Sequence, residues 1–133
     1  MMAITAVAPK GGIVETTDGA SKVLLLRNRE IERFEDAHRG IFEVWDGFFG
    51  RGTKPSSKEV RDLIALGLVG GGCKDADADD LVEQAGPEAL LQYYQIAQAL
   101  LGVAFMPDTV TEAEVKKKDN KAEEIQRDLR SVS

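Results

Sequence analysis

Three alternating aspartates are the residues of this sequence whose spacing comes nearest to a metal site. Asp75, Asp77 and Asp79 follow the pattern that opens the calcium loop of an EF-hand. That loop also needs glycine at its sixth position and glutamate at its twelfth, where this chain has Asp80 and Gly86. The calcium motif therefore fails. Carboxylates stabilise the positive end of a helix, so we predict that a helix starts here with Asp77 as its N-cap.

Neither nucleophilic catalysis nor phosphate binding has a complete set of residues. His38 is the only histidine, and the sequence places no serine or cysteine nucleophile beside it, so we expect a packed or surface histidine. Cys73 has no visible activating partner. The run Gly70–Gly72 is not followed by Lys-Ser or Lys-Thr, which a phosphate-binding loop requires, and is better explained as a helix stop. We predict no catalytic, cofactor-binding or metal site, and therefore no enzyme.

The composition fits a single acidic domain. The chain has 133 residues, a formal net charge of -6 and one cysteine. An acidic chain lacks the basic footprint of a protein that coats nucleic acid, and no apolar run approaches the ~20 residues that span a bilayer. Residues 1–10 lack the charged start and the long apolar segment of a signal peptide. We therefore expect a cytoplasmic protein without cofactors and without nucleic-acid or membrane partners.

The largest apolar surface is predicted for one aromatic stretch, residues 28–50. Its apolar side chains recur at gaps of three, four and seven, which places them on one face of a helix. We therefore predict a single helix with Asn28 as its N-cap, at the centre of the core, with the other elements packed over it. Glu35 is expected to pair with Arg27 or Arg39. The apolar face consists of Ile31, Phe34, Ile41, Phe42, Trp45, Phe48 and Phe49.

Local signals predict the remaining elements. Two β-branched runs, 12–17 and 22–27, flank an Asp-Gly pair and predict a β-hairpin. Ser56 followed by Glu59 three residues later is a capping box, which starts an apolar helix that stops at the glycine run. A proline at the first position then starts a long apolar helix over 87–105.

These elements define the predicted fold class and domains. We predict an α+β fold in which an N-terminal β-hairpin packs on a bundle of about four α-helices, with an extended C-terminal tail. Residues 1–11 form a flexible N-terminal arm and residues 12–107 form the domain. Residues 108–133 are rich in charge and lack aromatic side chains. We expect this polar extension to be disordered alone or helical on a partner.

The order of these segments resembles a known family. A strand ending in Leu-Leu-Leu-Arg runs into Ile31-Glu-Arg-Phe-Glu35, and a Pro-Ser-Ser loop leads to Leu63-Ile-Ala-Leu-Gly-Leu68 and a glycine-rich turn. An acidic helix start and a long Ala/Leu helix follow. Over about residues 12–106 the chain is similar to the small tail proteins of the gene-transfer-agent type. These are regarded as tail assembly chaperones, and the family has also carried a tail-tube label.

The resemblance implies a non-enzymatic role in building the tail of a siphophage or gene transfer agent. Tail assembly chaperones bind the tape measure protein, a long helical and apolar chain, before the tube polymerises. The implied partner is therefore the tape measure protein or another tail protein, in the cytoplasm of a bacterial host. One alternative is a structural tail or connector subunit that stays in the virion tail. Another is a cytoplasmic helical adaptor or a helix-turn-helix regulator.

The expected contact surface lies on the last predicted helix and on the extension. The 87–105 helix is apolar on more than one face, whereas a helix packed only on its own domain needs one stripe. The surplus either packs under the hairpin or contacts a partner, which is the tape measure protein or a second copy of the chain in a homo-oligomer. We predict partner contacts at Tyr93, Tyr94, Leu100, Ile125 and Leu129.

Overall fold

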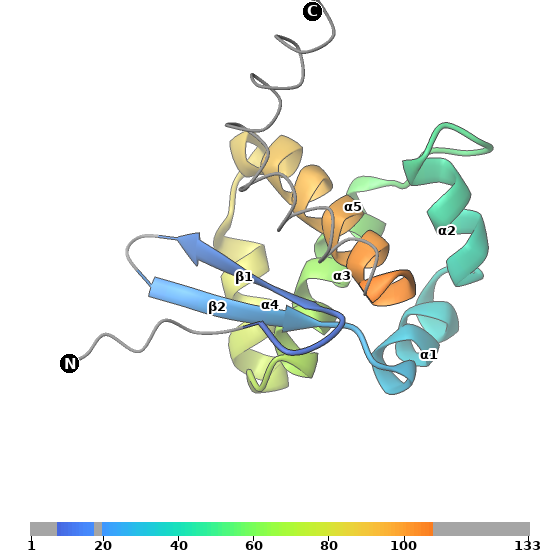
Figure 1. Ribbon diagram of the computed structural model, residues 1–133. Helices are drawn as coiled ribbons and strands as arrows, with labels where there is room; N and C mark the ends of the chain where they lie inside the picture. Colours follow the sequence, from blue (N-terminus) through green and yellow to red (C-terminus); the bar gives the residue numbers. More distant parts are fainter. Residues whose placement is uncertain (1–7, 18–19, 108–133) are drawn as a thin grey trace, which may run out of the picture.

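A hairpin and a set of helices form the fold (Figure 1). The computed structural model describes residues 8–17 and 20–107. Over these residues it has two strands, five α-helices and one 3-10 turn. The predicted α+β class, with an N-terminal hairpin on a small helical bundle, is confirmed. Residues 1–7 of the predicted arm and the 108–133 extension lie outside the described residues.

The predicted hairpin is present and consists of β1 (Gly12–Thr17) and β2 (Ala20–Leu25). β1 has the predicted bounds, whereas β2 begins and ends two residues before the predicted 22–27 run. The two strands are antiparallel, with Val14 opposite Val23. Successive strand residues point to opposite faces, and Leu24 is buried on the face that meets the helices. The hairpin packs on α3 and α5, which supplies the cover that an isolated two-stranded sheet needs in water.

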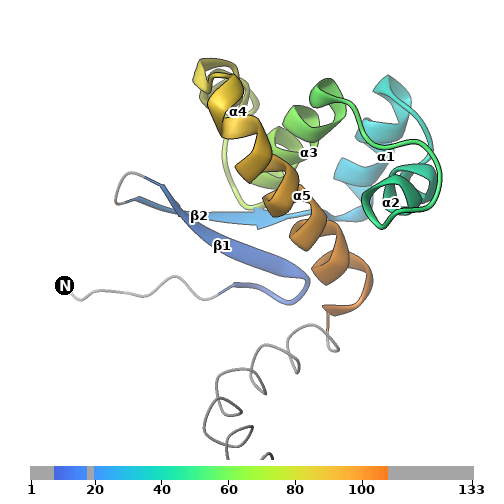
Figure 2. The ribbon, with the colours of Figure 1, turned by 90° about the horizontal axis from the view of Figure 1, so that it is seen from above.

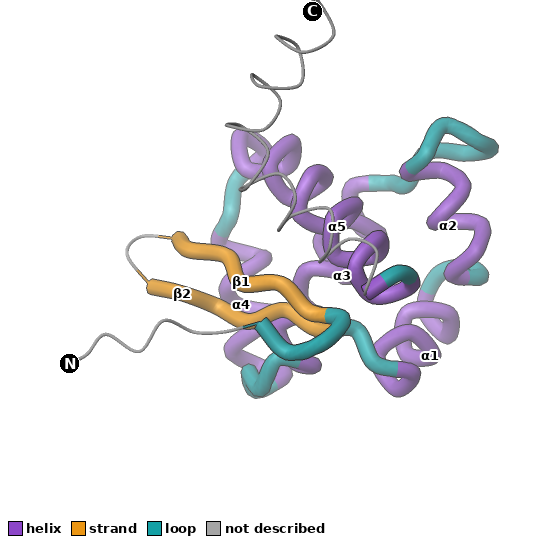
Figure 3. Tube along the Cα trace, viewed as in Figure 1, coloured by secondary structure: helices purple, strands orange, loops and turns teal. Residues whose placement is uncertain are grey.

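The aromatic stretch forms two helices, so the prediction of a single helix over 28–50 is wrong. The chain forms α1 (Asn28–Ala37) and α2 (Ile41–Phe48), with a break between them. Gly40, just before α2, has an extended backbone with φ of -58° and ψ of 140°. Glycine favours such a break because its helix propensity is low. The aromatic stretch therefore changes direction once, as Figure 3 shows between the two helices.

The start of α1 also differs from the prediction. Its N-cap is Arg27, and Asn28 is the first helical residue. The backbone N–H of Arg27 donates to Glu30 Oε1 at 2.9 Å, and the Arg27 guanidinium binds the same carboxylate. Glu30 is fully buried. An ion pair therefore starts the helix, where the sequence pointed to an asparagine side chain.

The central element is α3 (Ser57–Gly70), not the aromatic stretch. It packs on α1, α4, α5 and β2, and Figure 2 shows it between α4 on one side and α1 on the other. Its N-terminus carries the predicted Ser56–Glu59 capping box. A run through most of its length is buried. The buried residues are Glu59, Val60, Leu63, Ile64, Ala65, Leu66, Gly67 and Leu68.

The glycine run at the C-terminal end of α3 ends the helix, as predicted, and also allows a close approach to the hairpin. A Cβ added at Gly70 would lie 1.8 Å from the carbonyl oxygen of Leu25, and one added at Gly71 would lie 2.0 Å from that of Val23. Gly72 has a φ of +113°, a conformation that side chains disfavour. The end of α3 can therefore meet the backbone of β2 only because these positions lack side chains.

Two further helices complete the fold. α4 (Asp75–Gln84) has Lys74 as its N-cap, so it begins earlier than predicted, and Asp77 lies in its first turn. A 3-10 turn, η1 (Pro87–Ala89), then leads into α5 (Leu90–Phe105). The long apolar helix is thereby confirmed. Its fully buried residues are Ala97, Leu100 and Leu101.

Candidate partner-binding surfaces

His38, the residue with the most catalytic potential, lies in a packed environment. Its Nε2 lies 2.8 Å from Asp62 Oδ2 on α3, and its ring stacks near that of Phe34 with centroids 4.6 Å apart. These contacts agree with the expected packed histidine. Within residues 8–17 and 20–107, no group of three or more His, Cys, Asp or Glu side chains is placed to hold a metal ion.

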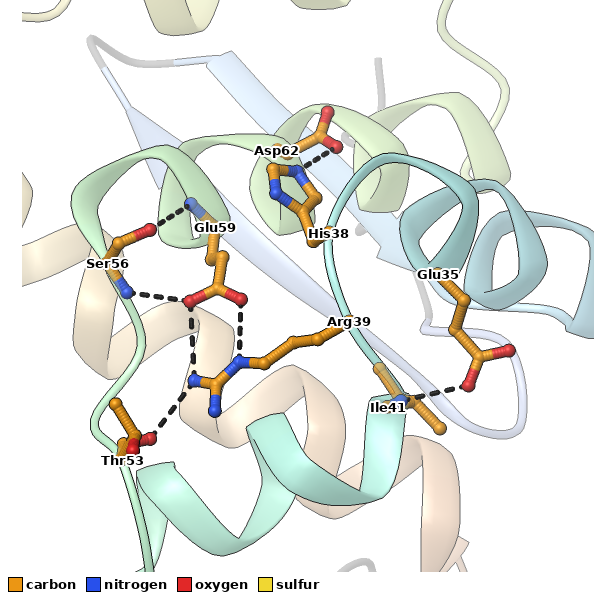
Figure 4. Close-up of polar contacts among 8 residues, drawn as sticks. All are labelled: Glu35, His38, Arg39, Ile41, Thr53, Ser56, Glu59 and Asp62. Atoms are coloured by element: carbon orange, nitrogen blue, oxygen red, sulfur yellow. Dashed lines mark hydrogen bonds and ion pairs between the residues drawn. The ribbon is translucent and has the colours of Figure 1, made fainter.

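A partly buried ion pair holds the junction between α1 and α2 (Figure 4). Arg39 donates from Nε and Nη2 to the two carboxylate oxygens of Glu59, at 2.8 and 3.3 Å, and from Nη2 to the carbonyl of Thr53 at 3.0 Å. Glu59 also accepts from the backbone N–H of Ser56 at 2.8 Å. Burial raises the pKa of Glu59, but the hydrogen bonds from Arg39 and Ser56 outweigh burial, so the pKa lies below its usual value.

Glu35 pairs with neither predicted arginine. Its Oε2 accepts the backbone N–H of Ile41 at 2.9 Å, so it satisfies one of the unpaired N–H groups at the start of α2. Arg27 is bound to Glu30, and its hydrogen bond lowers the pKa of Glu30 against the opposing effect of burial. The carboxylates in this region therefore fix helix ends.

An exposed aromatic patch is the most unusual surface of the described chain. We define the aromatic patch as Phe42, Trp45, Phe49 and Phe105. The ring centroid of Trp45 lies 4.4 Å from that of Phe49 and 5.1 Å from that of Phe105. The ring centroids of Phe42 and Phe105 lie 5.7 Å apart. Phe42 is 72% exposed and Phe49 40% exposed, and the neighbouring Met106 is also exposed. The patch joins α2 to the C-terminal end of α5.

Phe42 and Phe49 were predicted from the sequence to lie on the covered apolar face, but both are exposed, so this prediction is wrong. Each is the second residue of an apolar pair, after Ile41 and Phe48 respectively. Adjacent residues on a helix lie about 100° apart, so only one member of each pair faces inward. Ile41 and Phe48 are the buried members. The doubled apolar residues were the signal that could have revealed the aromatic patch.

The second candidate surface is a groove between the hairpin, α4 and α5, which we call the hairpin groove. It is a cavity of about 510 Å³ with a largely apolar lining. Tyr93 lies in this groove and is half-buried, and burial raises the pKa of its hydroxyl. The other lining residues include Glu15, Lys22, Leu24, Leu68, Leu81 and Ile96.

The predicted partner contacts are distributed between these surfaces and the core. Tyr93 lines the hairpin groove, and the ring of Tyr94 packs against Phe48 with centroids 4.9 Å apart. Leu100 is fully buried, so its assignment to a partner surface is corrected: it belongs to the core. Ile125 and Leu129 lie outside the described residues.

Comparison of the sequence with protein-family models shows which family the chain resembles. Residues 10–107 match the family described as "Phage tail tube protein, GTA-gp10". No curated protein and no solved structure matches the chain. In the described part of the chain, no helix is long and apolar enough to cross a membrane. The family match covers most of the sequence and nearly all of the described fold. The chain therefore belongs to the GTA-gp10 family of phage tail proteins.

Proposed function

We propose that this protein is an assembly chaperone that binds the tape measure protein while the tail is being built. Family membership supports a structural or morphogenetic role in a tail, and such proteins are typically non-enzymatic. The observation that carries the finer proposal is the exposed aromatic patch. Tail assembly chaperones need a surface that covers the apolar stripe of a long helical client. The patch offers this kind of surface.

The exposure of the aromatic patch supports a protein contact at this site. Large contiguous apolar patches on the surface of a protein often mark binding sites. Aromatic side chains give large contact areas and dominate the energy of many interfaces. Here the ring of Trp45 contacts those of Phe49 and Phe105, and the exposed ring of Phe42 contacts that of Phe105. A client helix that inserts apolar side chains against them would remove this surface from water.

The charges beside the aromatic patch define the client further. α2 carries Glu43 and Asp46 and has no basic residue, and the whole chain has a net charge of -6. Complementary charges fix the orientation of a complex and speed its formation. We therefore expect the client segment to be an amphipathic helix whose apolar stripe is flanked by lysine or arginine.

The test is co-purification of the tape measure protein with tagged variants of this chain. Phe42→Ser should reduce the recovered client about tenfold or more, as expected for an aromatic interface residue. Because Phe42 is largely exposed, the fold should remain intact. The matched control is Leu91→Ser, since Leu91 is 76% exposed and lies fourteen residues before Phe105 on α5, about 21 Å along the helix. Undiminished recovery with Phe42→Ser would contradict the proposal.

The other predicted contacts can be compared in the same assay. Tyr93→Asp places a charge in the hairpin groove, and a chain ending at Pro107 removes Ile125 and Leu129. A loss of client with either variant would add that region to the contact surface. Equal recovery with both would restrict the client to the aromatic patch.

A structural tail subunit is the second candidate, because the family description names a tail tube protein. A tube subunit stays in the particle, whereas a chaperone acts in the host cytoplasm and is released. Quantitative mass spectrometry of purified particles distinguishes the two. We expect the protein to be absent from mature particles. Its presence at a fixed ratio to the other tail proteins would favour the structural role.

A further inference from the structure

The outer edge of β1 presents backbone groups that point away from the hairpin. On the neighbouring strand, the carbonyl oxygens of Val23 and Leu25 meet the glycine run at the end of α3, so they point away from β1. In an antiparallel pair, directly opposite residues either exchange both hydrogen bonds or direct both sets of groups outward. Val14 lies opposite Val23, so the N–H and C=O of Val14 also point outward.

The same alternation assigns Thr16 and Gly12 to the outward set. Thr16 lies opposite Ser21, and their side-chain oxygens are 3.3 Å apart, as fits the closer side chains of an outward-directed pair. Gly12 donates its N–H to the carbonyl of Pro9 at 2.8 Å and not to β2. Gly12 therefore offers only its C=O to another strand, whereas Val14 and Thr16 offer both groups.

This edge lacks the features that usually protect a strand from pairing. Within residues 8–17 and 20–107, no backbone group bonds to the outward groups of Val14 and Thr16. Proteins commonly protect such an edge with proline, lysine or a bulge. β1 has neither proline nor lysine, and its six residues pair with β2 without a bulge. Its one charged residue, Glu15, lines the hairpin groove. The β1 edge is therefore a template for another strand.

We propose that β1 pairs antiparallel with β1 of a second copy of this chain, with Val14 on the two-fold axis. Such an axis places the same strand on both sides of the interface. Val14 then exchanges both hydrogen bonds with Val14 of the second copy. Thr16 lies opposite Gly12 of the second copy, and the Thr16 N–H donates to the Gly12 carbonyl. Two bonds from Val14 and two from Thr16 join the copies, and none of them needs the Gly12 N–H.

The two neighbouring registers fit the edge less well. A pairing centred on Glu15 would place two glutamates directly opposite each other, where like charges destabilise a sheet. A pairing centred on Ile13 would place Gly12 opposite Val14 and would need the Gly12 N–H, which is already bound within the chain. The register centred on Val14 avoids both faults. It also aligns Val14 and Val23 of both copies in one row of β-branched side chains, a favourable cross-strand arrangement.

A second copy suits this edge better than the client does. The client proposed above is a helix, which supplies no strand, whereas every copy of the chain carries the same edge. Pairing replaces two marginal two-stranded sheets with one of four strands. The outer strands of that sheet are the two copies of β2, whose outer edges meet α3, so the assembly stops at two chains. The β1 edge and the aromatic patch share no residue, so the two proposals succeed or fail separately.

Sedimentation equilibrium and amide hydrogen exchange on the full chain test the dimer. From micromolar to millimolar concentration, we expect the average mass to rise from that of one 14.5 kDa chain toward twice that value. The amides of Val14 and Thr16 should become protected over the same range. A single-chain mass throughout would overturn the proposal. Protection of both amides in the dilute monomer would show that the edge is filled within one chain, and would also overturn it.

Two cysteine variants test the register, both in a Cys73→Ser background that removes the natural thiol. Val14→Cys places the thiols of two copies opposite each other, with Cα atoms about 5.5 Å apart, which a disulfide can span. Thr16→Cys is the matched control, because the two copies of position 16 lie four residues apart along the strands, about 14 Å. We expect a covalent dimer under mild oxidation with Val14→Cys only. Equal dimer yields from the two variants, or none from Val14→Cys, would contradict the register.

A proline variant separates the β1 edge from the aromatic patch. Val14→Pro removes the Val14 N–H at an edge position that tolerates proline, and should raise the dissociation constant of the dimer about tenfold or more. Slow exchange at Ile13 and Glu15, whose groups point toward β2, would verify that the hairpin is intact. Phe42→Ser alters only the aromatic patch and should leave the dissociation constant unchanged. Loss of the dimer with Phe42→Ser but not with Val14→Pro would place the interface at the aromatic patch and overturn the proposal.

Discussion

Glu59 connects three segments through one carboxylate. It belongs to α3, accepts from Arg39 in the α1–α2 junction and accepts from the N–H of Ser56 that precedes its helix. Its side chain is 10% exposed. Removing one partner of a buried ion pair leaves the other charge uncompensated. The ion pair therefore connects the α1–α2 junction to the start of α3.

The lowered pKa of Glu59 predicts an acid-sensitive contribution to stability. A carboxylate whose folded pKa lies below its unfolded value stabilises the fold fully above the unfolded pKa, about 4.3. That contribution is lost as the pH falls through the folded pKa. Urea unfolding between about pH 3 and pH 7 should show a smaller loss of stability on acidification in Glu59→Gln than in the unmodified chain. Glu32→Gln, at an exposed position, is the control, and an identical pH dependence in all three proteins would refute the assignment.

A second prediction at this scale separates the aromatic residues by burial. Phe34 is fully buried, so Phe34→Ala should lower the free energy of unfolding by about 3–5 kcal/mol. From the sequence alone we would give this cost to Trp45, but Trp45 is only half-buried, so Trp45→Ala should cost less. Urea denaturation of both variants measures the difference. A larger loss for Trp45→Ala would contradict the burial seen here.

At the scale of elements, the features set by neighbouring residues could be predicted from the sequence, whereas those set by long-range contacts could not. The hairpin, the Ser56–Glu59 capping box and the long apolar α5 follow from neighbouring residues, and all are present. The break between α1 and α2 depends in part on Arg39 reaching Glu59, twenty residues further along the chain. The aromatic patch was missed for a related reason: periodicity locates an apolar face without showing which residues its neighbours cover.

The close contact between α3 and β2 predicts that two glycine-to-alanine substitutions have opposite effects on stability. Gly→Ala inside a helix usually stabilises by about 0.5–1 kcal/mol, and Gly102→Ala on α5 should do so because no atom lies within 4 Å of the added Cβ. Gly70→Ala should instead destabilise the fold, since its Cβ would lie 1.8 Å from the Leu25 carbonyl oxygen. Thermal unfolding of the two variants is the measurement. Similar shifts of the melting temperature in the two variants would show that the end of α3 is not in close contact with β2.

At the scale of the whole molecule, α5 links the two candidate surfaces. Tyr93, near its start, lines the hairpin groove, and Phe105, at its end, belongs to the aromatic patch. Twelve residues separate them, about 18 Å along the helix axis. Residues twelve positions apart also differ by about 120° around a helix, so the two surfaces lie on different sides of α5.

The position of Trp45 makes it an intrinsic fluorescence probe of the aromatic patch. Trp45 is the only tryptophan of the chain, and it lies half-buried among the rings of the aromatic patch. Indole emission shifts to shorter wavelength when water is excluded from the ring. A tryptophan-free client peptide added to the unlabelled protein should therefore produce a blue shift that comes entirely from this surface. The intrinsic fluorescence of the chain then reports occupancy of the patch directly, in real time and without any attached dye.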